Sequence, residues 1–138
     1  MVRLSADAKL ALKNARTIAE KQGKPSAGCL DVFEASILVS PEIQSSLKEN
    51  NIDWENIVAD TPDSSSRSFL SKLFHPVSFT SEVKTLLLFV SNQASITGLV
   101  TAKELALATL ELQDPEVIEK LGSIGVTIDQ CMIALQTP

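Results

Sequence analysis

The side chains best suited to chemistry are few: a single histidine, His75, and two cysteines, Cys29 and Cys131. His75 stands directly before Pro76, with no cysteine and no group of acidic residues beside it, so it cannot assemble a zinc site. The cysteines lie far apart and form no C-x-x-C motif. A disulfide between them stays open, although two apolar thiols in a reducing compartment are the favoured interpretation. We therefore expect no metal site, and an exposed loop position for His75.

Motifs for nucleotide binding or nucleophilic catalysis are absent from the sequence. It contains neither the phosphate-binding loop G-x-x-x-x-G-K-[ST] nor the elbow G-x-S-x-G. The glycines at 122 and 125 are interpreted as a helix break, and the acids from Glu111 to Glu119 as a solvated helix face. We expect no catalytic residues, no cofactor and no enzymatic activity. The enzymatic alternative is a small hydrolase, which would need a deep pocket holding two or more ionisable groups with mutually perturbed protonation.

Composition and charge narrow the classes of partner. The 138 residues carry a formal net charge of −5, which argues against nucleic acid or an anionic membrane as the main partner.

The first residues lack the apolar run of a signal peptide, so we expect a cytoplasmic protein, with the plastid stroma as the alternative compartment. Because only 4% of the residues are aromatic, the core must consist mainly of Leu, Ile, Val and Ala, which favours packed helices.

The stretch 4–23 occurs twice, because its pattern returns at 79–98. Apolar residues recur at helical spacing in both copies, and each residue of the second copy lies 75 positions after its counterpart. These residues are Leu4, Ala8, Ala11, Leu12, Ala15 and Ala19, followed by Phe79, Val83, Leu86, Leu87, Val90 and Ala94. Each copy opens with a hydroxyl residue and an acid, which suits a helix N-terminus, and closes with glycine. The sequence therefore predicts two equivalent long helices.

Three shorter helices are expected to follow each long one. Pro41 and Pro115 begin corresponding helices, and Asn51 and Gly125 occupy corresponding turns, at an offset of 74 positions. The fold class is thus all-α, with two pseudo-symmetric four-helix repeats and about eight helices in a single domain, 1–138. We expect repeat one at 3–59, a linker at 60–78 and repeat two at 79–136, with the repeats packed through their long first helices.

The linker combines a polar, turn-rich segment with an apolar one. Residues 60–66 are rich in Ser, Asp and Pro, whereas Phe69, Leu70, Leu73 and Phe74 recur at helical spacing. This segment either docks on the body of the domain or forms a contact for a partner, and docking is the favoured interpretation because buried apolar stripes are commoner.

Two copies of a four-helix unit in this order resemble the N-terminal domain of Clp-type AAA+ unfoldases, which include ClpC, ClpA and ClpB. The family segment that resembles I-G-T-E-H-L-L is matched by residues 100–107, V-T-A-K-E-L-A-L, and more loosely by 28–33. A later leucine and glycine-valine turn is matched by 121–126, L-G-S-I-G-V. The resemblance covers about residues 3 to 136. It implies a non-catalytic module that binds protein substrates, adaptors, or Clp ATPase and peptidase subunits.

The same resemblance directs attention to the starts of the second helices. Some family members bind phosphorylated arginine through a glutamate that corresponds here to Asp31 and Lys103; Glu104 lies one residue beyond, and Lys103 has the opposite charge. For Asp31, a helix cap is the favoured interpretation. The expected protein-binding surface is a groove between the repeats, bordered by Asp31, Glu34, Lys103 and Glu104 and by the linker residues Phe69, Leu73 and Phe74. The structural alternative is a helical scaffold or oligomerisation domain unrelated to proteolysis.

Overall fold

The structure is a computed structural model that describes residues 3–23, 26–58, 78–93 and 98–136. Within these ranges the chain forms eight helices and four strands of two residues each. The helices are α1 (Ala6–Lys21), α2 (Cys29–Val39), α3 (Pro41–Glu49), α4 (Trp54–Ile57), α6 (Ser81–Gln93), α7 (Ala102–Glu111), α8 (Pro115–Ser123) and α9 (Ile128–Gln136). The strands are β1 (Arg3–Leu4), β2 (Ser26–Ala27), β3 (Ser78–Phe79) and β4 (Leu99–Val100). The predicted all-α class and double repeat are confirmed.

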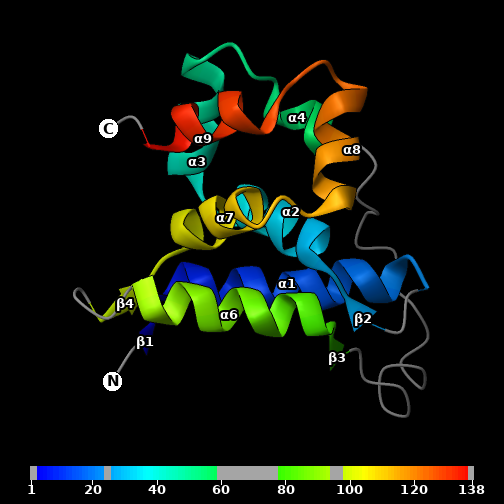
Figure 1. Cartoon of the computed structure of the whole chain (residues 1–138), viewed down its shortest axis with the longest axis vertical. Coiled ribbons are helices and arrows are strands. Elements are labelled where there is room, and N and C mark those ends of the chain that lie inside the picture. The colour runs from blue at the N-terminus through cyan, green and yellow to red at the C-terminus, as the bar shows by residue number, and fades with distance from the viewer. Residues whose placement is uncertain (1–2, 24–25, 59–77, 94–97, 137–138) are drawn as a thin grey trace.

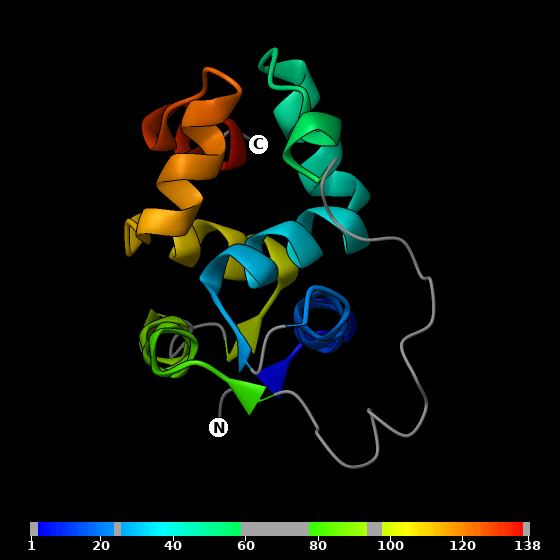
Figure 2. The same ribbon diagram turned by 90° about the vertical axis from the view of Figure 1, so that its right-hand side faces the viewer.

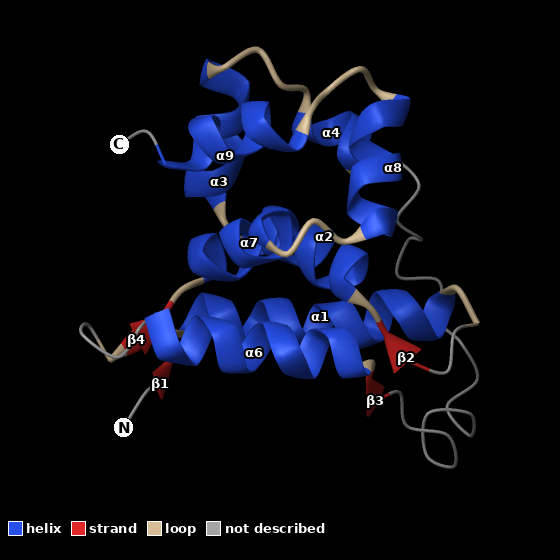
Figure 3. Cartoon of the chain, in the orientation of Figure 1, coloured by secondary structure: helices blue, strands red, loops and turns tan. Residues whose placement is uncertain are grey.

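The helices form three layers, with α2 and α7 in the middle (Figures 1 and 3). On one side α1 and α6 bury their apolar stripes in a cluster that includes Val32 and Leu105. On the other side α3, α4, α8 and α9 surround a second cluster that includes Phe33 and Leu110. Each middle helix therefore buries two opposite faces, which explains why α2 is apolar around almost its whole circumference.

The repeats join through α2 and α7, so the predicted packing through the long first helices is wrong. The most extensive contact between the repeats is that of α2 with α7, whereas α1 packs mainly on α2. Seen nearly end-on, α1 and α6 stand apart beneath the middle layer (Figure 2). The predicted stripe residues within α1 and α6 are buried or partly buried, but periodicity does not say which helix a stripe faces. Ala94, the last residue of the predicted second stripe, lies outside the described residues. Leu86 is fully buried, while Leu87 is only partly so.

Four short strands, which the sequence did not predict, tie the repeats together. The pairing is crossed and parallel: β1 pairs with β4, and β2 with β3. The Ser5 N–H donates to the Val100 carbonyl at 2.8 Å, and the Thr80 N–H donates to the Ala27 carbonyl at 3.0 Å. Strands of two residues show no alternating pattern, so periodicity cannot detect them. Each strand leads directly into α1, α2, α6 or α7 and fixes where that helix begins.

Helix caps and turns repeat between the halves as the sequence predicted. The Ser5 and Thr80 hydroxyls accept from the N–H groups of Ala8 and Val83. At the turn after α3, Asn51 has φ of 62°, and its counterpart Gly125 has φ of 76°. Both positions require left-handed backbone, which asparagine and glycine tolerate better than other residues.

Candidate functional site

Two of the sequence-predicted site residues lie inside the protein. Asp31 is fully buried, and its carboxylate accepts from the Gly28 N–H at 2.9 Å, which closes the first turn of α2. Glu34, one turn further along α2, is only 3% exposed. Because both side chains are buried, neither is presented on the surface of the protein.

The other two predicted residues lie at the start of α7. Glu104 has the position in α7 that Asp31 has in α2, because each is three residues after its helix N-cap, Thr101 or Gly28. The structural counterpart of Asp31 is therefore Glu104, whereas the sequence comparison paired it with Lys103. Lys103 instead reaches across to α3, where its Nζ lies 3.5 Å from Glu42 Oε1.

The starts of α2 and α7 lie at opposite ends of the middle layer, so among the described residues the two helix starts do not lie beside one another. Figure 1 shows β2 entering α2 at one end and β4 entering α7 at the other. The pseudo-symmetry of the repeats explains this separation, because it places equivalent elements at opposite ends. Phe69, Leu73 and Phe74, together with His75, lie outside the described residues.

At the α2 end, the starts of three helices surround two adjoining hollows. One, of about 290 Å³, is lined by Gly28, Cys29, Thr80, Glu82, Asp114, Pro115 and Glu116. The second, of about 310 Å³, is lined by Leu30, Glu116, Glu119, Lys120 and Ser123. Glu116 belongs to both, and we call the two together the α8 groove. Four carboxylates and one lysine line it, so its electrostatic potential favours cationic groups.

The Cys29 thiol borders the α8 groove, where its surroundings favour the protonated form. Burial raises the pKa of Cys29 to about 12, and the negative charges of Asp114, Glu82 and Glu116 act in the same direction. A thiol with this pKa stays protonated at neutral pH and reacts slowly. Burial likewise raises the pKa of Cys131 to about 12. The two cysteines are free thiols and belong to different core clusters.

The start of α7 is built from equivalent elements to the start of α2, but it carries less negative charge. Asp7, the counterpart of Glu82, accepts from the Ala102 N–H at 3.4 Å. Ser40 stands where the α2 end has Asp114, and Lys103, the counterpart of Leu30, pairs with Glu42. The two ends are thus equivalent in fold, but the α2 end is more acidic.

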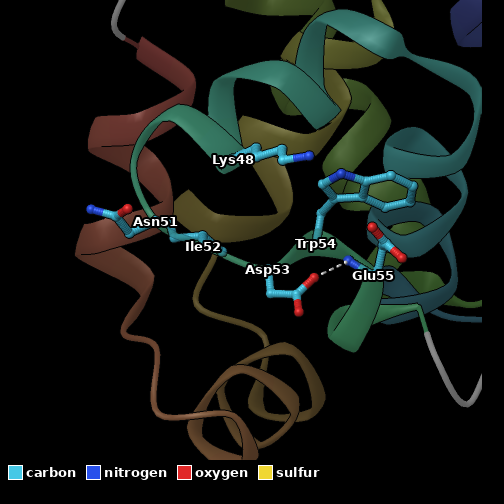
Figure 4. A pocket seen from close by; sticks show the side chains of 6 residues that line it. All are labelled: Lys48, Asn51, Ile52, Asp53, Trp54 and Glu55. Carbon is cyan, nitrogen blue, oxygen red and sulfur yellow. Dashed lines mark hydrogen bonds between the residues drawn. The ribbon is translucent and has the colours of Figure 1, made fainter.

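A third hollow lies at the turn between α3 and α4, away from both helix starts. It has a volume of about 340 Å³ and is lined by Lys48, Asn51, Ile52, Asp53, Trp54 and Glu55 (Figure 4). Trp54 was not among the site residues predicted from the sequence. The difference between the repeats could have drawn attention to Trp54, since the second repeat has isoleucine at the corresponding position, Ile128.

The part of the chain that the structure describes contains no group of three or more His, Cys, Asp and Glu residues that could hold a metal ion. Among the same residues, no helix is both long enough and apolar enough to cross a membrane.

Comparison with known proteins identifies the fold. The sequence matches no protein-family model and no curated protein sequence. The structure is similar to the N-terminal domain of Hsp104 from Candida albicans, with a TM-score of 0.71, 15% identity, and coverage of 96% of this chain and 88% of that one. It is also similar to the N-terminal domain of the caseinolytic protease associated chaperone ClpD from Arabidopsis thaliana, with a TM-score of 0.68, 12% identity, and coverage of 96% and 92%. The chain has the fold of a Clp N-terminal domain.

Proposed function

We propose that this chain is a non-catalytic docking module that receives protein substrates or adaptors for a Clp-type chaperone or protease, or attaches to it as an accessory factor. The main support is the likeness to two chaperone N-terminal domains over 96% of the chain, which includes both repeats. Those domains belong to an Hsp104 and to a chaperone associated with a caseinolytic protease.

The α8 groove is the docking surface that we favour. It lies at the start of α2, where the resemblance directed attention, and presents Glu82, Glu116 and Glu119 to solvent. Acidic side chains around a hollow suit a basic segment of a partner, since complementary charge raises the rate of encounter and fixes orientation. Phe69, Leu73 and Phe74 remain part of the proposal as apolar contacts.

The test is direct binding of the full chain to purified components. The chain, immobilised on a surface, is exposed to the Clp-type ATPase and to the Clp peptidase core of the same organism, each alone. We expect saturable binding to at least one of them, weakened by raised salt because screening reduces charge complementarity. The absence of binding to both would contradict the proposal and favour a helical scaffold.

A pair of charge-reversal variants locates the surface. Glu116→Lys with Glu119→Lys inverts the rim of the α8 groove, and both residues are exposed, so the fold is retained. The matched control, Glu49→Lys with Asp129→Lys, makes the same change of net charge at exposed positions on α3 and α9. We expect the first pair to weaken binding and the second to leave it unchanged. Equal effects would show that net charge, and not the α8 groove, determines binding.

A further inference from the structure

The turn between α3 and α4 holds the only tryptophan of the chain in an unusual position. Trp54 is half-buried: part of its side chain packs against the second core cluster, and part lines the hollow of about 340 Å³. Figure 4 shows Lys48 extending toward the indole from one side, and the Glu55 carboxylate on the other side of the ring. The indole is thus a wall of an open space and is only partly used by the core.

Comparison of the two repeats shows that the fold does not need a tryptophan there. The turn is closed in the same way in both halves, since the Ile52 N–H donates to the Leu47 carbonyl and the Val126 N–H to the Leu121 carbonyl, each at 2.9 Å. In this register Trp54 corresponds to Ile128, and Lys48 to Gly122. An isoleucine satisfies the core at this position, so the additional ring surface of Trp54 is available for another purpose. Tryptophan is enriched among the residues that dominate protein interfaces.

The charges around the hollow indicate which group would enter it. Asp53 and Glu55 are both exposed and supply two carboxylates, against the single ammonium of Lys48. Asp53 Oδ1 accepts from the Glu55 N–H at 3.1 Å, which holds the start of α4 in place and leaves its second oxygen available. An aromatic face with carboxylates at its edge suits a planar cation, because guanidinium stacks on indole and hydrogen-bonds to carboxylate at the same time.

We propose that this hollow, which we call the Trp54 site, binds the side chain of an arginine from a partner protein. The guanidinium would stack on the Trp54 indole and pair with Glu55, while the exposed Lys48 side chain moves away from it. The Trp54 site belongs to α3 and α4, whereas the α8 groove belongs to α2, α6 and α8, so this inference does not depend on the proposed chaperone partner.

The chain supplies its own probe for the test. It has one tryptophan and no tyrosine, so its intrinsic fluorescence reports Trp54 alone. The full chain is titrated with the blocked peptide acetyl-Ala-Arg-Ala-amide, and with the same peptide in which uncharged citrulline replaces arginine. We expect a saturable change in Trp54 emission at millimolar arginine peptide and a much weaker one with citrulline. No difference between the two peptides would overturn the proposal.

The signs of two charge variants distinguish this site from general charge attraction. Glu55→Gln should weaken binding of the arginine peptide by about two- to five-fold, the size expected of an exposed ion pair. Lys48→Gln should tighten it by about two-fold, because it removes a like charge. Asp129→Asn, which changes the net charge as Glu55→Gln does but at an exposed position on α9, should have no effect. The reverse signs, with preference for acetyl-Ala-Glu-Ala-amide, would show that Lys48 recruits an acid and would refute the proposal.

Loss of structure cannot imitate these results. Lys48 and Glu55 are exposed, so neither substitution disturbs the core. The indole N–H of Trp54 gives a single resonance in the proton–nitrogen NMR spectrum, and its position without peptide verifies that each variant keeps the native site. With peptide, that resonance should move in parallel with the fluorescence; an unmoved resonance at saturating peptide would place the bound arginine elsewhere and refute the assignment.

Discussion

Gln113 occupies a backbone conformation that disfavours glutamine. The residue follows α7 with φ of 53°, in the left-handed region that glycine, and to a lesser degree asparagine and aspartate, adopts more readily than glutamine. Gln113→Gly should therefore stabilise the protein by about 0.5–1 kcal/mol. The measurement is the free energy of unfolding in urea. The control is the opposite change, Gly125→Ala, which should destabilise the protein. Gly125 has φ of 76° and open space around it, so a loss of stability in this variant would reflect backbone strain alone. A Gln113→Gly variant less stable than wild type would show that the glutamine is not strained in this turn.

The two buried thiols predict a loss of stability in alkali. Burial raises the folded-state pKa of Cys29 and Cys131 from 9.0 to about 12, so between these values the folded protein retains protons that the unfolded chain releases. Stability should therefore fall as pH rises from about 9 toward 12, by at most about 1.4 kcal/mol per pH unit for each thiol. The free energy of unfolding is measured from pH 8 to 11 for the wild type, for Cys29→Ala, for Cys131→Ala and for the double variant. Its decrease with pH should be less steep in each single variant than in the wild type, and least steep in the double variant. Equal slopes in all four proteins would exclude the thiols as the cause.

At the scale of the elements, Asp7 joins α1 to the start of α7. Its carboxylate accepts from the Ser5 hydroxyl and from the N–H of Ala102, a residue of the other repeat. Asp7→Ala should destabilise the protein by about 1 kcal/mol, the usual cost of losing a cap of this kind. Its counterpart Glu82 is exposed and accepts a long hydrogen bond of 3.5 Å from the Ser81 hydroxyl, so Glu82→Ala should cost less than about 0.5 kcal/mol. Thermal melts of the two variants provide the comparison, and equal losses would contradict the assigned role of Asp7.

The helices and turns also show which structural features local sequence patterns can predict. Caps, apolar stripes and the turns at Asn51 and Gly125 involve residues within a few positions of one another, and all of these were predictable. Asp31 was recognisable as a helix-capping residue for the same reason. The pairing of Lys103 with Glu42 and the lining of the α8 groove depend on which helix lies beside which, and no local pattern specifies that.

At the scale of the whole molecule, duplication explains both what was predicted and what was missed. The repeated pattern identified two equivalent halves, but two copies of one unit can pack through any pair of equivalent faces. The choice of α2 and α7 is consistent with their sequences, because both helices must bury two faces. The crossed pairing of β1 with β4 and of β2 with β3 then makes each half dependent on the other.

This dependence predicts that neither repeat folds alone. A fragment of residues 1–62 would expose the faces of α2 that contact α7 and would leave β1 and β2 without their partner strands. A fragment of residues 76–138 would have the same deficits on α7, β3 and β4. Each fragment alone should therefore show weak helical circular dichroism and no cooperative melt, since short helices are marginal without tertiary packing. Mixed at equal concentration, the two should recover the native spectrum with a melting temperature that rises with concentration. Cooperative melting of either fragment by itself, at a temperature independent of concentration, would show that the middle layer is not shared in the way the strand pairing and the α2–α7 contact require.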